Sequence, residues 1–204
     1  KYCPEDKINY RFFTTEKGNI DVTKAEQITK VALLYSNQSR DWPRGAAYPP
    51  DVLGFSQLLN MEQVPHVFIN ERGLNKKILQ KYNVLFVCNA MSLSEDNLAE
   101  IRDFARSGGT VYLSNRVAAS NENGDLRDQW SFADDFKMER IDRPITAEKL
   151  FSGDDFQAVF ESEIPIHGVR CRPAEDSAAK VLCEFETKQG VRFPAAFEVA
   201  YGKG

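Results

Sequence analysis

The chain has 204 residues, of which 42% are hydrophobic and 27% charged, so it has the composition of a soluble globular domain and can bury a core without disulfides or metal. Its net charge of −4 argues against a nucleic-acid partner, because phosphate binding needs a surplus of Lys and Arg. No apolar run approaches the about 18 residues of a membrane helix, and Lys1–Tyr10 lacks the apolar region of a signal peptide. We therefore expect a soluble chain with no membrane partner.

Residues 31–113 alternate short apolar runs with segments of helical spacing. The apolar runs predict strands buried on both faces, at Val31–Tyr35, His66–Ile69, Val84–Cys88 and Thr110–Leu113. The segments between them predict helices at Asp51–Met61, Leu74–Tyr82 and Leu93–Arg106. This alternation with short connections predicts an α/β sandwich around a mainly parallel sheet, with right-handed crossovers.

The last of these helices carries the clearest end signals. Ser92 and Glu95 fit a capping box, and Ser94 is an equally good cap. Gly108-Gly109 follows the helix, where glycine permits the left-handed backbone that ends many helices. The same glycines do not form a phosphate loop, because neither G-x-G-x-x-G nor a P-loop lysine is present.

The regular alternation ends at Ser114. Residues Ser114–Asp142 are polar and rich in Asn, Asp and Gly, and loops of this length inside compact domains tend to be functional or mobile. Later apolar runs predict strands that extend the sheet or add antiparallel strands, at Phe156–Phe160, Val181–Phe185 and Phe193–Ala200. The closing Tyr201-Gly202-Lys203-Gly204 has the form of a turn that leads into another strand, so we expect a piece of a longer protein, truncated at its C-terminus.

Neutral hydrogen-bonding groups follow the four predicted strands. In open α/β sheets, ligand sites form beyond the carboxyl ends of the strands. We therefore predict a rim, suited to a polar pocket or an interface, that comprises Ser36, Asn37, Asn89, Met91, Ser114, Asn115 and Arg116. Asn and Ser also favour turns and helix caps, so ordinary loop structure explains the same pattern.

Two aromatic residues, Trp42 and Tyr48, lie in the loop Arg40–Pro50 after the first predicted strand. Aromatic residues in loops can stack on sugar rings, anchor a protein interface, or cover the core of their own domain. The sequence does not separate these three roles. We include both residues in the predicted rim and count carbohydrate among the candidate partners.

Nucleophilic catalysis has little support in the sequence. The G-x-S-x-G motif of α/β-hydrolases is absent. The chain has only two histidines: His66 opens a strand away from the carboxyl ends, and His167 lies in an irregular region, so we expect both to be structural. The acidic pairs Asp134-Asp135 and Asp154-Asp155 are a weak signal for glycosidase carboxylates, because acidic loop pairs are usually solvated.

The four cysteines include no C-x-x-C pair, and they are scattered through the chain. With only two histidines to complement them, we expect neither a metal nor another cofactor. Cys88 lies in an apolar run, which is typical of a buried and inert thiol. Cys171 and Cys183 could pair across two neighbouring strands, and their spacing alone does not decide this.

Several of these stretches together resemble a known family. The strand Val31-Ala-Leu-Leu-Tyr-Ser36, the helix Leu93–Arg106 with Gly108-Gly109, and the closing Phe193-Pro-Ala…Tyr201-Gly-Lys-Gly204 resemble the β-galactosidase trimerisation domain of multidomain glycoside hydrolases. The resemblance covers residues 30–204, and the closing motif is its more particular part. It implies a flavodoxin-like three-layer sandwich of the class I glutamine-amidotransferase type.

The chain departs from the catalytic members of that superfamily. Catalytic amidotransferases place a nucleophilic Cys after the strand that follows the Gly-Gly turn, where this chain has Ser114-Asn115-Arg116. Their His-x-Glu motif is also missing, because Gly168 and Val169 follow His167. In β-galactosidases the catalytic acids belong to a preceding (β/α)₈ barrel. The resemblance therefore implies that residues 1–29 connect to such a barrel and that residues 30–204 form an accessory domain.

The resemblance and the missing nucleophile favour a non-catalytic accessory domain of a β-galactosidase-like glycoside hydrolase. Such a domain packs subunits into a homo-oligomer and helps to wall a neighbouring active site, so the barrel of the same chain and further copies of the chain are its expected partners. Two other functions stay open. One is a stand-alone hydrolase of amidotransferase-like fold that uses Ser114 as nucleophile, and the other is a carbohydrate-binding module that uses Trp42 and Tyr48.

Overall fold

The computed structural model describes residues 28–42, 48–152 and 159–204, with side chains described outside residues 140–170. Residues 1–27 of the expected connector, the acidic pair Asp154-Asp155, most of the predicted strand Phe156–Phe160 and the side chain of His167 lie outside the described residues. Among the described residues, no helix combines the length and apolarity needed to cross a membrane.

The predicted parallel sheet is confirmed. Its four strands run parallel in the order β2-β1-β3-β4, and their bounds are Val67–Ile69, Val31–Leu34, Val84–Cys88 and Thr110–Ser114. The central strand β1 lies between its partners with Leu33 opposite Phe68 on one side and Phe86 on the other. Residues 32–34 are completely buried, as expected for a strand covered on both faces.

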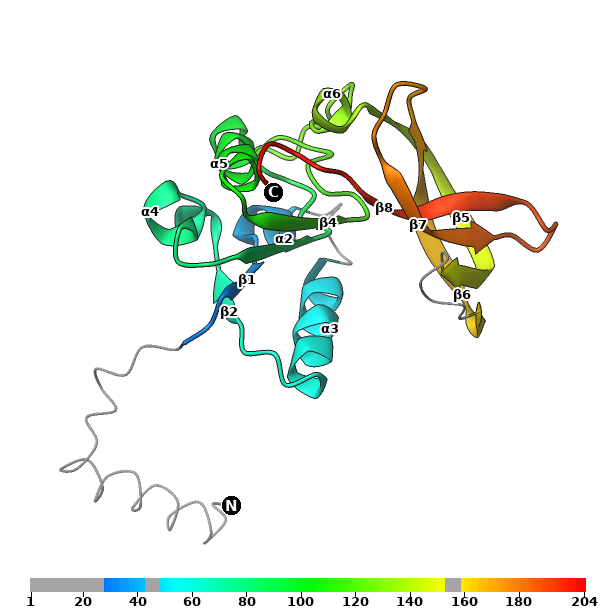
Figure 1. The fold of residues 1–204 in the computed structure, drawn as a ribbon, viewed down its shortest axis with the longest axis horizontal. Coiled ribbons are helices and arrows are strands. Elements are labelled where there is room, and N and C mark those ends of the chain that lie inside the picture. The colour runs from blue at the N-terminus through cyan, green and yellow to red at the C-terminus, as the bar shows by residue number, and fades with distance from the viewer. Residues whose placement is uncertain (1–27, 43–47, 153–158) are drawn as a thin grey trace, which may run out of the picture.

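Helices cover both faces of this sheet (Figure 1). The helix α3 lies on one face, and the helices α4 and α5 lie on the other, with bounds Tyr48–Met61, Lys76–Leu79 and Glu95–Arg106. Ser94, rather than Ser92, caps α5, because its hydroxyl accepts the Asn97 N–H at 3.3 Å. Gly108 follows the helix with φ = 108°, so the predicted glycine ending is also confirmed.

The sequence did not predict three short helices. They are α2 at Asn37–Asp41, a 3₁₀ turn η4 at Glu71–Gly73, and α6 at Ala133–Phe136. Each is five residues or shorter, too short to show the apolar stripe on which a helix prediction depends. The predicted helix Leu74–Tyr82 is reduced to Lys76–Leu79, capped by the side chain of Asn75.

The C-terminal strands form a second, antiparallel sheet instead of extending the first. Its order is β6-β5-β7-β8, with bounds Val159–Pro173, Met138–Ser152, Lys180–Glu186 and Arg192–Glu198. Of the two arrangements left open, added antiparallel strands are confirmed and extension of the parallel sheet is wrong. The sequence also failed to predict β5, whose pairing with β6 shifts register between Ile141 and Pro144, because charged residues and a proline interrupt its apolar pattern.

The antiparallel sheet separates two cysteines that were considered as a pair. Cys171 lies on β6 and Cys183 lies on β7, and β5 runs between those two strands. The sulfurs are not joined to each other. A disulfide across neighbouring strands is therefore wrong for these residues, because the central β5 keeps their backbones two strands apart.

After β8 the chain returns to the parallel-sheet unit (Figure 1). The Lys203 N–H donates to the carbonyl oxygen of Arg106 at 3.2 Å, at the end of α5. The Tyr201 hydroxyl donates to Asp135 Oδ1 at 2.7 Å, just beyond the start of α6. Residues 201–204 therefore satisfy an open carbonyl at the carboxyl end of α5 and connect it to α6.

Candidate functional site

Most residues of the predicted rim lie at or just after the carboxyl ends of the parallel strands. Ser36 follows β1, Asn89 follows β3, and Ser114 is the last residue of β4. The Asn89 N–H donates to Ser114 Oγ at 3.1 Å, so the ends of two neighbouring strands are linked directly. Met91 and Arg116 follow the ends of β3 and β4 and line a groove.

Ser36 and Tyr48 are buried structural groups. The Ser36 hydroxyl donates to Glu71 Oε1 at 2.7 Å and accepts the Ser39 N–H at 3.0 Å, which caps α2. The Tyr48 hydroxyl accepts the Ser36 N–H and donates to the carbonyl oxygen of Leu34 at 2.9 Å. Tyr48 is completely buried, and burial raises its pKa. It belongs to the core and has no surface on which a sugar could stack.

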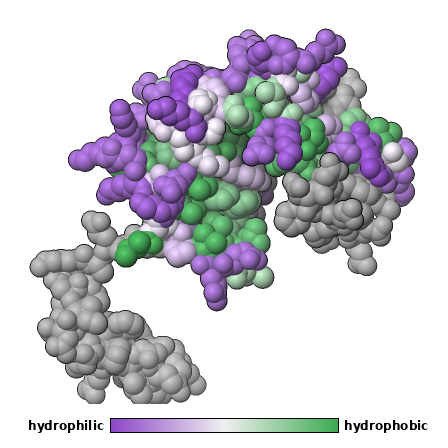
Figure 2. Space-filling model, viewed as in Figure 1, coloured by the Kyte–Doolittle hydropathy of each residue, from purple (hydrophilic) through white to green (hydrophobic). Residues whose placement is uncertain are grey.

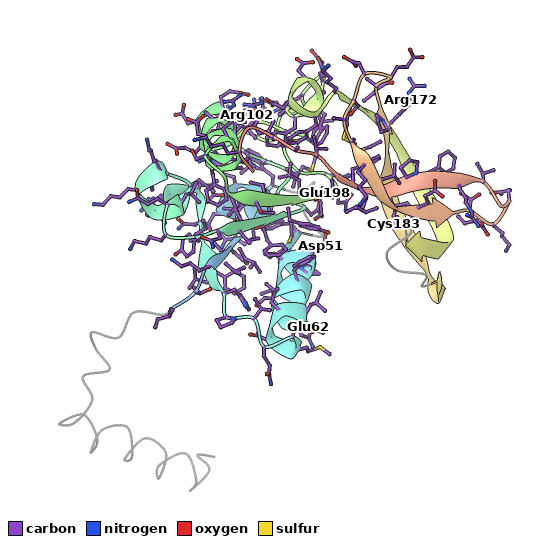
Figure 3. All side chains as sticks on the ribbon, viewed as in Figure 1. Asp51, Glu62, Arg102, Arg172, Cys183 and Glu198 are labelled. Atoms are coloured by element: carbon purple, nitrogen blue, oxygen red, sulfur yellow. The ribbon has the colours of Figure 1, made fainter. Side chains whose placement is uncertain are left out.

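Asn89 organises the loop after β3. Its backbone has φ = 48°, in the left-handed region, and its amide donates to Asp51 Oδ2 at 2.5 Å. Its side-chain oxygen accepts the Arg116 N–H at 3.3 Å. Figure 3 places Asp51 at the start of α3, so this amide joins one helix to two strand ends. Asn115 also has a positive φ of 55°, and it is exposed.

Ser114 has no activating partner in the described part of the chain. Its hydroxyl oxygen accepts the Asn89 N–H, and no hydrogen bond joins it to an imidazole or a carboxylate among the described residues. His66 lies elsewhere: its Nε2 is 2.7 Å from Ser56 Oγ and its Nδ1 is 3.0 Å from the carbonyl oxygen of Val64. Activation of a serine hydroxyl needs a base within hydrogen-bond reach, so these contacts give no support to a nucleophilic role.

Trp42 is held on the surface by the loop between β4 and β5. Its Nε1–H donates to the carbonyl oxygen of Glu122 at 3.1 Å, and its ring packs against Gly124, where an added Cβ would lie 2.7 Å from the ring. The side chain stays 40% exposed. Asn37, the first residue of α2, lines a separate hollow with Leu53 and Phe68.

A groove of about 1000 Å³ lies between the parallel-sheet unit and the antiparallel sheet. Residues 126–139 form much of its wall, including Trp130 and α6, and Figure 1 shows this segment running between the two sheets. Met91 and Arg116 are the rim residues that reach it. The sequence signalled the segment only as a long polar loop, and no local pattern marks Trp130, because the indole is positioned in part by its hydrogen bond to Val117, 13 residues earlier in the chain.

Charged side chains in the groove are largely paired. Lys137 forms an ion pair with Asp176, which lowers the pKa of that carboxyl, and Glu139 pairs with Arg172. Arg127 pairs with Glu95. Among the described residues, no group of three or more His, Cys, Asp or Glu side chains is placed to hold a metal ion.

Three large apolar side chains of α3 are exposed. Leu53, Leu58 and Met61 are 52%, 48% and 73% exposed, and Phe68 of the edge strand β2 lines one hollow with Leu53. We call Leu53, Leu58, Met61 and Phe68 the α3 face. Figure 2 shows hydrophobic residues gathered over this part of the molecule. Contiguous exposed apolar surface of this kind is typical of interaction sites.

No protein-family model matches the chain, and no curated protein matches its sequence. Solved structures match its fold. A catalytic mutant of Gan42B, a GH42 β-galactosidase from G. stearothermophilus, is 18% identical with a TM-score of 0.73, over 88% of this chain and 27% of that chain. The β-galactosidase from Bacillus circulans sp. alkalophilus is 15% identical with a TM-score of 0.75, over 90% of this chain and 28% of that one.

In a third similar structure, the match covers most of the other protein. A ThuA-like protein from Bacteroides uniformis is 12% identical with a TM-score of 0.57, and the match covers 88% of this chain and 85% of that protein. The chain therefore spans 27–28% of these two β-galactosidases and most of the ThuA-like protein. At these identities the likeness establishes a shared fold.

Proposed function

We propose that this chain is a non-catalytic accessory domain of a β-galactosidase-like glycoside hydrolase. The observation that carries the proposal is the shared fold, which takes up nearly all of this chain and 27–28% of two β-galactosidase chains. The glycosidic chemistry then belongs to a preceding (β/α)₈ barrel, and residues 1–29 connect that barrel to the domain. The rim residues that stay exposed, such as Asn115 and Arg116, help to wall the active site of a neighbouring domain.

The contacts of the candidate nucleophile support the non-catalytic part of this proposal. Ser114 Oγ is occupied by a backbone N–H from Asn89, with no base bonded to it in the described residues. The ThuA-like match covers most of that protein, so the fold is not confined to large glycosidases. No contact of Ser114 among the described residues favours a stand-alone hydrolase.

The α3 face supports the subunit-packing part of the proposal. We assign its occupant as a second copy of the chain, because a homo-oligomer is the arrangement in which the accessory domain packs subunits together. Its side chains expose apolar surface that a monomer would leave in water. A specific interface buries on the order of 1000 Å² or more, so the α3 face would form its centre and not its whole area.

The first experiment sequences the gene upstream and downstream of the segment that encodes residues 1–204. It then assays glycosidase activity in the full-length protein and in residues 1–204 alone. We expect an upstream barrel with two suitably placed glutamates. We also expect hydrolysis of p-nitrophenyl β-galactoside by the longer protein and none by residues 1–204 alone. Glycosidase activity in residues 1–204, or a reading frame that begins near Lys1 with no barrel, would overturn the proposal.

The packing role is tested in the same longer protein by light scattering after size-exclusion chromatography. The double variant Leu58→Glu/Met61→Lys places charges in the α3 face, so we expect it to dissociate the oligomer. Val191→Lys is the matched control, since Val191 is also apolar and 48% exposed but lies outside the α3 face. An unchanged oligomer in the double variant would refute the assignment of the α3 face.

A further inference from the structure

The groove between the two sheets combines an immobilised aromatic ring with unpaired polar groups. The Trp130 Nε1–H donates to the carbonyl oxygen of Val117 at 2.9 Å, and its ring packs against Phe132 and Phe136 at centroid distances of 5.8 and 6.0 Å. These contacts fix the indole, which is half-buried and lines the groove. A rigid aromatic surface costs little conformational entropy when a ligand packs on it.

The groove that this ring lines also contains hydrogen-bond acceptors and hydrogen-bond donors. Asp128 and Arg116 line the groove and are exposed, and the structure shows no partner for either side chain among the residues it describes. Gln129 donates weakly to Asp134 at 3.3 Å, which leaves most of the hydrogen-bonding capacity of that amide and carboxylate open. The groove therefore offers acceptors and donors to the same ligand.

The charge of the groove is nearly balanced. Its lining includes three cationic side chains and four carboxylates, and the ion pairs of Lys137 with Asp176, Arg127 with Glu95 and Glu139 with Arg172 neutralise most of them. Asp128 and Asp134 would repel a strongly anionic ligand, and Arg116 would repel a cation. The balance favours a neutral ligand that is rich in hydroxyl groups.

The groove is large enough for a ligand of several sugar rings. Its volume is about 1000 Å³, at the upper end of the about 300–1000 Å³ typical of small-molecule sites. From the fixed indole, the mixed polar groups and this size, we propose that the groove binds a neutral oligosaccharide. The C–H face of one sugar ring packs on Trp130, while hydroxyl groups donate to Asp128 and accept from Arg116.

This inference goes beyond the proposed function and differs from the sequence hypothesis that used Trp42 and Tyr48. Tyr48 is buried and Trp42 lies against Gly124, and neither lines the groove. Trp42 and Trp130 are the two tryptophans of the chain. The variant Trp42→Phe therefore leaves Trp130 as the single tryptophan reporter for a fluorescence titration.

The test titrates the Trp42→Phe protein with three neutral tetrasaccharides, β-1,4-galactotetraose, cellotetraose and xylotetraose, by fluorescence and by calorimetry. Tetragalacturonate serves as an anionic probe of the same length. We expect saturable binding of at least one neutral probe with a change in Trp130 emission. Adding Asp128→Asn and Arg116→Gln together should weaken that binding by about tenfold or more, because hydrogen bonds to charged groups are lost.

A matched control adds Arg72→Gln and Asp96→Asn, which change exposed charges outside the groove and should leave the affinity as it was. The inference is overturned if no neutral probe saturates, if tetragalacturonate binds more tightly, or if the groove variant binds like the control. Thermal unfolding of each variant confirms that it is folded. The oligomeric state and glycosidase assays do not depend on this outcome, so the two proposals can fail separately.

Discussion

Asn89 shows how one residue can stabilise the carboxyl edge of a parallel sheet. It adopts φ = 48°, and its side chain bonds Asp51 and the Arg116 N–H. Its own N–H donates to Ser114. Asn adopts the left-handed region at lower cost than most residues, because its side chain can replace lost backbone hydrogen bonds.

We expect Asn89→Ala to lower the free energy of unfolding by about 2–3 kcal/mol, because it removes two side-chain hydrogen bonds and leaves Ala in the left-handed region. Asn89→Gly removes the same bonds but adopts a positive φ freely, so it should be about 1 kcal/mol more stable than the Ala variant. Urea unfolding followed by circular dichroism measures both. Equal stability of the two variants would show that the backbone conformation has no energetic cost.

Cys88 should be chemically silent in the folded protein. Burial, with the nearby charge of Asp51, raises the pKa of its thiol to about 12, and the thiolate is the reactive form. At pH 8 we expect Ellman's reagent to leave Cys88 unmodified in the native protein and to modify it in urea, as peptide mass mapping would show. The half-buried Cys183 serves as the internal comparison, and equal native labelling of the two would contradict the prediction.

The same pKa gives a pH dependence with a definite sign. The unfolded thiol ionises near its ordinary pKa of 9.0, whereas the folded thiol stays protonated until about 12. The contribution of Cys88 to stability is therefore fully present below pH 9 and is lost as the pH rises through that window. Cys88→Ala should flatten the fall in unfolding free energy between pH 9 and 11.

At the scale of elements, local patterns predicted the parallel sheet and the strands β7 and β8 of the second sheet, but not the long strand β5. The runs Val31–Leu34 and Val84–Cys88 are continuous and apolar, so burial on both faces is visible in the sequence. In Met138–Ser152, charges and Pro144 interrupt the alternation, and a 15-residue strand with register shifts leaves no simple period to detect.

Some residues of the candidate site could be placed from the sequence, and others could not. Parallel strands end at one edge, so the sequence alone could place Asn89 and Ser114 together. The burial of Tyr48 depends on its hydrogen bonds to Leu34 and Ser36, which join residues from two elements. The Trp130 indole donates to the carbonyl oxygen of Val117, 13 residues earlier in the chain. Such positions follow from tertiary packing and have no local signature.

The close packing of residues 201–204 against α5 requires a glycine at position 202. Gly202 has φ = 68°, and an added Cβ would lie 2.6 Å from the Cα of Arg106. Gly202→Ala therefore combines a strained backbone with a clash against backbone atoms, and we expect a loss of about 2–3 kcal/mol in unfolding free energy. Denaturant unfolding measures this loss.

Gly190→Ala is the control for that variant. Gly190 also has a positive φ, of 75°, but nothing lies within 4 Å of an added Cβ. It should cost about 1 kcal/mol, the backbone contribution alone. If both glycine variants lost the same stability, close packing of residues 201–204 against α5 would be refuted.

At the scale of the whole molecule, Asp135 joins three parts of the chain. Its Oδ2 accepts from Arg102 Nε of α5 at 2.7 Å, and its Oδ1 accepts from the Tyr201 hydroxyl at 2.7 Å. Figure 3 shows Arg102 on α5. Arg102 also lies over the Phe132 ring at 5.3 Å. The acid that the sequence offered as half of a glycosidase pair is thus a structural link between α5, α6 and the returning C-terminal segment.

Asp135→Asn tests this link, and Asp134→Asn is its natural control. The first variant leaves the guanidinium of Arg102, which is 21% exposed, without its carboxylate, so we expect about 2 kcal/mol of destabilisation. Asp134 is exposed and accepts only the Gln129 amide in the described residues, so its variant should stay within about 0.5 kcal/mol. Because Tyr201 also loses a charged acceptor, hydrogen exchange at the Lys203 N–H should quicken in Asp135→Asn alone. A uniform change across the whole chain would instead mean that Asp135 supports global stability without tying the C-terminal segment to α5.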